Sequence, residues 1–148
     1  GYWRYFVGGA QNLPWDFGLD EDLSWTNTED RFSEGLWRLS LSRRGLPWLP
    51  DSYLNATVYN IYNPEGPDYG STLSCSAPFF NGNLNLDGNA SYRYGPTSVK
   101  KRSFRASDFS IHGNWRVNDA WSVDAGATQT YQEEIKSFMV NGGLSYRW

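Results

Sequence analysis

The feature that most constrains this 148-residue chain is a two-residue alternation of apolar and polar side chains, which returns along most of its length. It is clearest at the C-terminal end, where Phe138, Val140, Leu144 and Tyr146 alternate with polar residues and glycine. Successive side chains of a β-strand point to opposite faces of a sheet, so the alternation predicts strands with one apolar and one polar surface. No segment shows a helical period, and we therefore expect an all-β fold.

Eight segments carry this alternation, and they predict an antiparallel up-and-down β-barrel of about eight strands. They are residues 16–27, 35–43, 54–58, 72–79, 83–93, 108–117, 121–130 and 137–148. The pairs Asn81-Gly82 and Asn118-Asp119 predict tight hairpin turns. The links expected to be longer are residues 26–30, 63–68, 95–104 and 132–136, with 44–50 as a stiff, proline-containing exception on the side of the tight turns. We expect short turns on one rim and longer loops on the other.

The composition favours a membrane barrel over a soluble one. Hydrophobic residues make up 39% of the chain and aromatic residues 18%, with 8 Trp and 10 Tyr. A soluble domain of this size would carry more Leu, Ile and Met in its core. Many aromatic and few aliphatic residues fit a thin apolar belt with aromatic rings at both edges, which is the exterior of a transmembrane barrel. The lack of any long apolar run excludes a transmembrane helix, which needs about 20 such residues.

The last residues, Gly143-Leu144-Ser145-Tyr146-Arg147-Trp148, resemble the terminal signal of bacterial outer-membrane β-barrels. Over residues 15–148, the spacing of strands and turns is most similar to the small eight-stranded barrels of the OmpX/Ail type. The resemblance implies a bacterial outer-membrane location, contact with outer-membrane lipid and lipopolysaccharide, and recognition by the barrel-insertion machinery. It also implies that Gly143, Tyr146 and Trp148 act as the insertion signal.

Residues 1–14 precede the expected barrel of residues 15–148 and are either an interfacial segment or an extra strand. Single-chain bacterial barrels normally have an even number of strands. If residues 1–14 form a strand, the chain is expected to be the C-terminal portion of a larger barrel.

The polar surface of the predicted strands carries nearly balanced charges. Eight strands leave an interior filled by side chains, so we expect an interior polar network that stabilises the barrel. Its predicted members are Asp20, Arg38, Asp87, Arg93, Asp108, His112, Arg116, Asp124 and Arg147, with Asp22 beside them. The alternative is a lining that selects polar or charged solutes, which would require more than eight strands.

No catalytic residue, metal site or cofactor is expected. Asp108, Ser110 and His112 share a face, but same-face neighbours on a strand lie roughly 7 Å apart, too far for the Ser–His hydrogen bond of a nucleophile. Cys75 is the single cysteine, so no intrachain disulfide can form. The net charge of −3 gives no reason to expect a nucleic-acid partner.

One basic cluster lies in the longest predicted external link. Lys100, Lys101 and Arg102, with Arg105, could contact the phosphates of lipopolysaccharide, or they could form a merely solvated loop. Three functional classes remain open. The favoured one is a non-enzymatic outer-membrane barrel that displays loops for surface interactions. The others are a porin or export channel, or part of one with other barrel subunits as partners, and a lipid-modifying enzyme.

Overall fold

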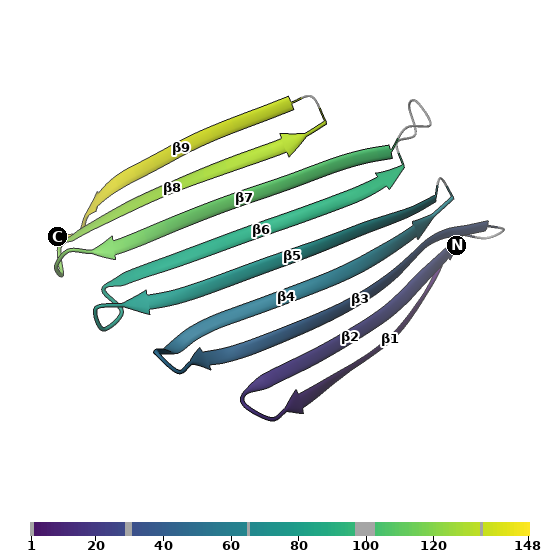
Figure 1. Cartoon of the computed structure of the whole chain (residues 1–148), viewed down its shortest axis with the longest axis horizontal. Coiled ribbons are helices and arrows are strands. Elements are labelled where there is room, and N and C mark those ends of the chain that lie inside the picture. Colours follow the sequence, from purple (N-terminus) through teal and green to yellow (C-terminus); the bar gives the residue numbers. More distant parts are fainter. Residues whose placement is uncertain (1, 29–30, 65, 97–102, 134) are drawn as a thin grey trace.

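The computed structural model describes residues 2–28, 31–64, 66–96, 103–133 and 135–148. These residues form a single sheet of nine antiparallel strands whose order in space follows their order in the chain (Figure 1). The strands are β1 (Tyr2–Leu13), β2 (Phe17–Thr28), β3 (Arg31–Leu46), β4 (Leu49–Asn63), β5 (Gly66–Phe79), β6 (Leu84–Pro96), β7 (Ser103–Arg116), β8 (Trp121–Gln132) and β9 (Ile135–Tyr146). None of the described residues belongs to a helix that could cross a bilayer.

The prediction of an all-β, antiparallel, up-and-down fold is confirmed, but the expected count of eight strands is wrong. The additional strand is β1, which pairs with β2 along its whole length, from Tyr2 opposite Thr28 to Leu13 opposite Phe17. A turn with left-handed backbone at Trp15 and Asp16, both at φ 61°, joins the two strands. Phe6 lies on the polar side of β1 and interrupts its alternation. The backbone N–H and C=O groups of β1 can nevertheless form hydrogen bonds with those of β2 in the hairpin.

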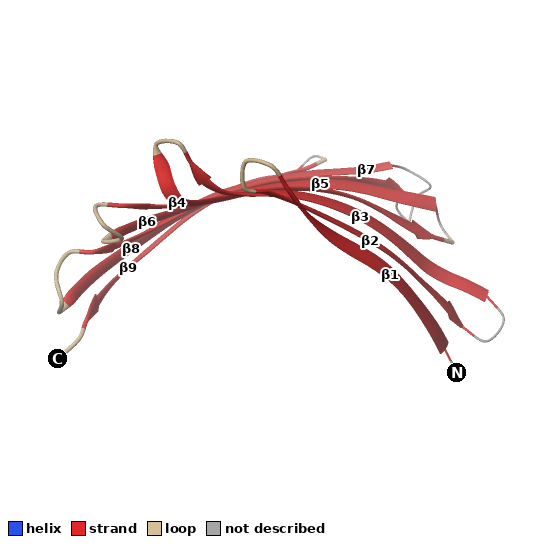
Figure 2. Ribbon diagram, turned by 90° about the horizontal axis from the view of Figure 1, so that it is seen from below, coloured by secondary structure: helices blue, strands red, loops and turns tan. Residues whose placement is uncertain are grey.

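The sheet does not close on itself, so the prediction of a closed barrel is not confirmed. Strands β1 and β9 are its two edges, and neither is paired with the other in the described part of the chain. Figure 2 shows that the sheet is strongly arched, with one convex and one concave side. Such arching is the curvature that a section of barrel wall has.

The cross-strand register places every strand residue on one of two faces, because directly paired residues share a face. One row of partners crosses the sheet from β3 to β7 and is polar throughout. It consists of Ser40, Thr57, Thr72, Ser91 and Asp108. The neighbouring row on the other side is apolar and consists of Leu41, Ala56, Leu73, Ala90 and Phe109. We call the two sides the polar face and the apolar face.

Burial on these faces is the reverse of that in a soluble protein. No hydrophobic residue among those described is buried, whereas Ser24, Ser40 and Asp68 on the polar face are only 5–9% exposed. Side chains on a concave surface converge and shield one another, so we assign the polar face to the concave side of the arch. The apolar face is then convex and open to its surroundings.

The predicted difference between the two rims is largely wrong. Three of the four links expected to be long are spanned by strand ends, since β2 ends at Thr28 and β3 begins at Arg31. Likewise β4 ends at Asn63 and β5 begins at Gly66, while β8 ends at Gln132 and β9 begins at Ile135. By the bounds of the described strands, the longest link is the one between Pro96 and Ser103. The strands extend beyond their alternating segments because backbone pairing continues without regard to side-chain polarity.

The proline-containing link between β3 and β4 is also short, with only Pro47 and Trp48 between the strands. Gly45 adopts a φ of +72°, and the register shifts between Arg44 and Leu46. The Ser52 hydroxyl accepts a hydrogen bond from the Leu46 amide at 3.2 Å and donates one to the Leu49 carbonyl at 2.7 Å. These contacts fix the turn at the end of the hairpin.

Candidate functional site: the apolar and polar faces of the sheet

The middle of the apolar face is built from aliphatic and small side chains. Most of its larger members are exposed, for example Val58 at 44%, Ile111 at 57% and Val140 at 66%. The central positions are Val7, Leu23, Leu41, Ala56, Val58, Leu73, Cys75, Ala90, Ile111, Ala125, Ala127, Val140 and Leu144. The thiol of Cys75 is exposed among them. This face therefore offers a continuous band of apolar surface.

Aromatic rings border this band at both ends of the strands. The rim that carries the turns after β1, β3, β5 and β7 has Trp15, Phe17, Trp48, Phe79, Phe80, Trp115, Trp121, Tyr146 and Trp148. The opposite rim has Trp3, Tyr5, Trp25, Tyr62, Tyr69, Tyr92, Tyr94, Tyr131 and Phe138. Neighbouring rings pack together at both ends, with centroids 5.3 Å apart for Tyr5 and Trp25 and 4.7 Å apart for Trp121 and Tyr146.

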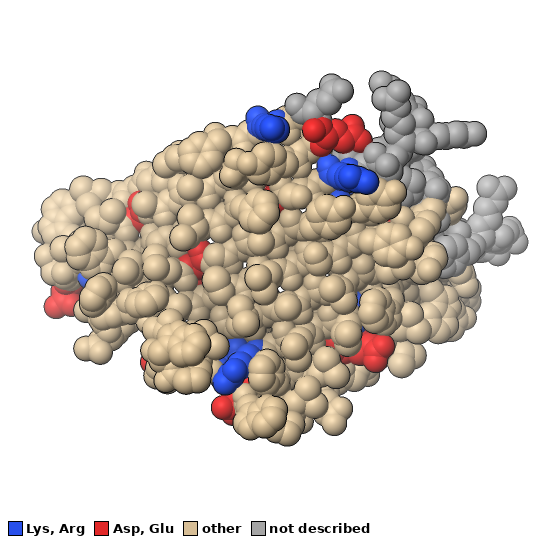
Figure 3. All heavy atoms as spheres, viewed as in Figure 1, with Lys and Arg blue, Asp and Glu red and all other residues tan. Residues whose placement is uncertain are grey.

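Basic residues of the apolar face lie at these same aromatic borders. The guanidinium of Arg43 lies 4.9 Å from the ring centre of Phe17, and that of Arg105 lies 5.7 Å from the ring centre of Tyr94. Lys136 lies over Tyr131 in the same way. Figure 3 shows a face of the sheet on which uncharged residues occupy most of the surface. Long basic side chains at the border of an apolar band can reach water while their stems stay in the band.

One acidic residue departs from this arrangement. Glu21 lies on the apolar face near the middle of β2, opposite Gly9 of β1 and Leu39 of β3. Its carboxylate accepts a hydrogen bond from the indole nitrogen of Trp37 at 3.0 Å. The sequence interpretation did not single out Glu21, although the run Asp20-Glu21-Asp22 requires that one of the three carboxylates point to the apolar side.

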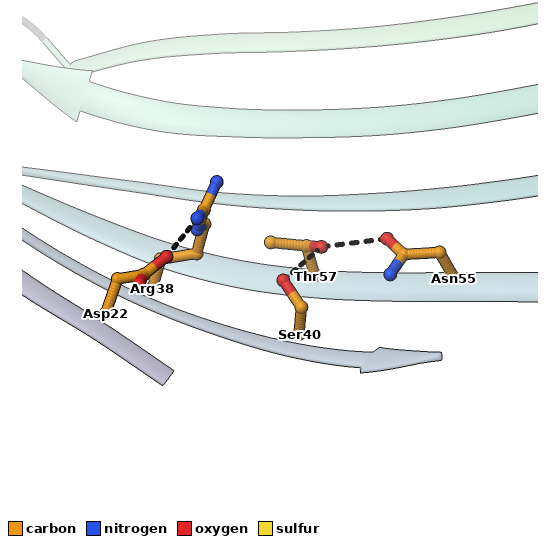
Figure 4. Close-up of polar contacts among 5 residues, drawn as sticks. All are labelled: Asp22, Arg38, Ser40, Asn55 and Thr57. Carbon is orange, nitrogen blue, oxygen red and sulfur yellow. Dashed lines mark hydrogen bonds and ion pairs between the residues drawn. The ribbon is translucent and has the colours of Figure 1, made fainter. Parts of the chain in front are cut away.

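The polar face carries an ion pair and hydroxyl contacts in its β2–β4 part (Figure 4). Arg38 pairs with Asp22. The hydroxyls of Ser40 and Thr57 lie 2.9 Å apart, and Thr57 donates a hydrogen bond to the Asn55 side chain at 3.0 Å. These groups line a polar hollow of about 400 Å³ on the concave side.

A second ion pair joins Arg93 of β6 to Asp68 of β5. The sequence predicts a link over residues 63–68, whereas Asp68 lies inside β5 and is 5% exposed. A Cβ atom on Gly95 would collide with the Asp68 carboxylate, so a larger residue at this position would have to displace the Asp68 side chain. The alternation Asp68, Gly70, Thr72 is the signal that could have found it, because it continues the polar face of β5.

The register places the predicted network residues of β2 to β8 on the polar face, as expected from their alternation. These are Asp20, Arg38, Asp87, Arg93, Asp108, His112, Arg116 and Asp124, while Arg147 follows the end of β9. Ser91 donates a hydrogen bond to Asp108 at 3.3 Å, and His112 lies opposite Asp87. Within the described chain, no ion pair joins Asp87, Arg116, Asp124 or Arg147 to an opposite charge. The two ion pairs that the structure describes, Arg38–Asp22 and Arg93–Asp68, share no residue with each other.

Of the remaining predicted site residues, Gly143, Tyr146 and Trp148 lie in or just after the last part of β9, and Arg105 lies near the start of β7. Gly143 and Tyr146 belong to β9, and a Cβ atom on Gly143 would approach the Asp124 carboxylate to 2.7 Å. The strand ends at Tyr146, two residues before the expected end, and Trp148 is fully exposed with its ring 6.0 Å from that of Tyr146. Arg105 is exposed in β7, whereas Lys100, Lys101 and Arg102 lie outside the described residues. The described part of the chain contains no group of His, Cys, Asp and Glu that could hold a metal ion.

Comparisons with known proteins add little to this geometry. No protein-family model matches the chain, and no curated protein matches it. One similar solved structure is the NanC porin in its rhombohedral crystal form. The similarity covers 97% of this chain and 72% of that chain, with a TM-score of 0.47 and 8% identical residues.

Proposed function

We propose that this chain forms the wall of a bacterial outer-membrane β-barrel without enzymatic activity. Its convex apolar face contacts lipid, and its concave polar face lines the interior. The observation that carries the proposal is the reversed burial, with apolar side chains exposed and Ser24, Ser40 and Asp68 shielded. Only a surrounding that is itself apolar makes such a surface favourable.

The dimensions of the apolar face support a bilayer-spanning role. In β8 the outward rings of Trp121 and Tyr131 are separated by ten residues. At about 3.4 Å per residue and a strand tilt of about 40°, the two rings lie about 26 Å apart along the membrane normal. Outer-membrane barrels carry an apolar band about 25 Å tall between two aromatic girdles. The spacing of the rings therefore fits the thickness of the hydrocarbon layer.

A soluble sandwich would need a second layer to cover the apolar face. All strands that the structure describes belong to one sheet, so none of them packs over that face. An exposed apolar surface of this extent on a soluble protein would drive aggregation. Lipid is the covering that the chemistry of the face favours.

A second candidate, a porin or export channel, is favoured by the strand count. With nine antiparallel strands in chain order, β1 and β9 run in the same direction. Direct pairing of these edges would be parallel, unlike every other pair in the sheet, whereas an odd number of additional strands would keep all pairs antiparallel. Open sheet edges are not tolerated in lipid. Additional strands would also widen the interior, so the polar hollow beside Asp22 and Arg38 could line a path for solutes.

Membrane insertion can be measured by tryptophan fluorescence in vesicles that contain lipids brominated at defined depths. We expect Trp121 and Trp148 to be quenched most by bromine near the headgroups, because rings of the girdles lie at that level. A protein that remains water-soluble, with no quenching at any depth, would refute the proposed location.

Planar-bilayer recordings separate the two candidates. A barrel whose interior is filled by side chains should give no steady conductance, whereas large and stable single-channel currents would favour the channel. Hydrolysis of phospholipid by the purified protein, abolished by His112→Ala or Ser110→Ala, would instead support the lipid-modifying alternative.

Two partners are part of the same proposal. The terminal residues Tyr146 and Trp148 are proposed to be read by the barrel-insertion machinery, because exposed rings end the last strand. Lys100, Lys101, Arg102 and Arg105 are proposed to contact lipopolysaccharide phosphates. Arg105 is exposed at the rim opposite Trp148. We expect that rim to face the outside of the cell.

A further inference from the structure

The position of Glu21 does not fit a surface that contacts lipid alone. The described basic residues on the apolar face of the strands, Arg43, Arg105 and Lys136, all lie at the aromatic borders. Glu21 instead lies four residues inside the end of β2, well within the apolar band, and its side chain is exposed. Ionisable groups inside a membrane mark interaction or functional sites, because facing lipid is unfavourable for them.

The surroundings of Glu21 form a hollow rather than a smooth apolar wall. About 670 Å³ of open space lies over β1 and β2 and is lined by Val7, Gly9, Gln11, Leu19, Glu21 and Leu23. A Cβ atom on Gly9 would meet nothing within 4 Å, so the backbone of β1 is uncovered there. The Gln11 side chain is exposed and has no hydrogen-bond partner within the described part of the chain.

We propose that this hollow is an interface between two copies of the chain in the membrane, related by a twofold axis along the membrane normal. The inference rests on the proposed function, since it requires the apolar face to lie in lipid. Around such an axis, Gln11 of each copy donates a hydrogen bond to Glu21 of the other. Gly9 lies nearest the axis and allows the two backbones to approach closely.

Symmetry favours a second copy over a different partner. Gln11 and Glu21 lie on adjacent strands as diagonal neighbours, about 7–8 Å apart by strand geometry. The patch therefore presents a donor beside an acceptor, which a twofold axis brings together reciprocally. When both copies are inserted in the same direction, Gln11 lies at the same depth in each copy, and so does Glu21. Because the strands are tilted by about 40° to the axis, β1 of one copy crosses β1 of the other at a steep angle. The contact between the copies is therefore compact and centred on Gly9.

Cysteine cross-linking tests this geometry in the full chain. In a Cys75→Ser background, Gly9→Cys is placed in phosphatidylcholine vesicles at low protein density and oxidised. We expect a disulfide-linked dimer to form much faster than with Ala125→Cys, which is also exposed on the apolar face but lies on β8. Cross-linking of Gly9→Cys no faster than that of Ala125→Cys would overturn the proposal.

Energy transfer between donor- and acceptor-labelled copies in the same vesicles gives a second readout. Glu21→Leu and Gln11→Leu should each weaken association about tenfold or more, because each removes both reciprocal hydrogen bonds. Gln129→Leu removes a polar side chain from the apolar face outside the hollow and should leave energy transfer unchanged. Unchanged association of Glu21→Leu would contradict the proposed contact.

Bromolipid quenching in the same samples tests the proposed dimer and the proposed barrel separately. Protein that is quenched by lipid but remains monomeric refutes the dimer and leaves the proposed barrel standing. Protein that is not quenched has not inserted, and this outcome overturns both.

Discussion

Replacing Ala125 by Arg is the most direct test of which face meets lipid. Ala125 lies on the apolar face of β8, four residues from Trp121 and six from Tyr131. At about 3.4 Å per residue and a tilt of about 40°, it lies about 10 Å below the nearer aromatic girdle. This depth is close to the middle of an apolar band about 25 Å tall.

The expected loss of folding free energy follows from that depth. An Arg on the lipid face of a barrel costs about 2–4 kcal/mol at the midplane and about 0–1 kcal/mol near the interfaces. Gln129→Arg is the matched control, since it lies on the same face of the same strand but only about 5 Å from the Tyr131 girdle. Thr128→Arg controls for the polar face, where the charge meets other polar groups.

Urea-induced unfolding from phosphatidylcholine vesicles measures all three variants. We expect Ala125→Arg to be destabilised by about 2–4 kcal/mol, and Gln129→Arg and Thr128→Arg by about 1 kcal/mol or less. If Ala125→Arg and Gln129→Arg lose the same free energy, the apolar face does not experience a bilayer with a depth gradient. A larger loss for Thr128→Arg than for Ala125→Arg would reverse the assignment of the faces.

Three further outcomes are expected. Asp68→Ala should lower the free energy of unfolding by about 1–3 kcal/mol, because the nearly buried carboxylate pairs with Arg93, and a double-mutant cycle with Arg93→Ala measures the coupling. Gly95→Ala should destabilise the protein by about 1–3 kcal/mol by displacing the Asp68 side chain, and the same unfolding assay should show the loss shrinking in an Asp68→Ala background. Deletion of Trp148 should lower the yield of membrane-inserted protein in cells, as measured by fractionation; a normal yield would contradict the role of the terminal ring.

The fold class could be predicted from the sequence because it depends on one robust signal. Alternation with a period of two determines both the strand conformation and the face on which each side chain lies. It therefore predicts the polar side for Asp87, Asp108 and Asp124, and the strand register places them there. Strand pairing in chain order followed from the hairpin turns.

The strand count and loop lengths could not be predicted in the same way. Both depend on how far backbone hydrogen bonding continues, and this does not require alternation. The segment 54–58 alternates clearly, yet the strand around it runs from Leu49 to Asn63. For β1 the sequence leaves an interfacial segment and an extra strand both open, because Tyr2 and Phe6 place rings on the polar side and blur the alternation.

Two informative residues, Asp68 and Glu21, could not be recognised from the sequence. At both positions, the face that the alternation gives disagrees with what the residue types alone suggest. Asp68 continues the polar face of β5 into a segment that reads as a loop because of its neighbouring prolines and glycines. Glu21 is the reverse case, a carboxylate that strict alternation forces onto the apolar face between Asp20 and Asp22. An apolar residue at that position would suit contact with lipid better and would fit the strand equally well. The exposed carboxylate, its hydrogen bond to Trp37 and the open backbone at Gly9 are the three observations on which the proposed contact between copies depends.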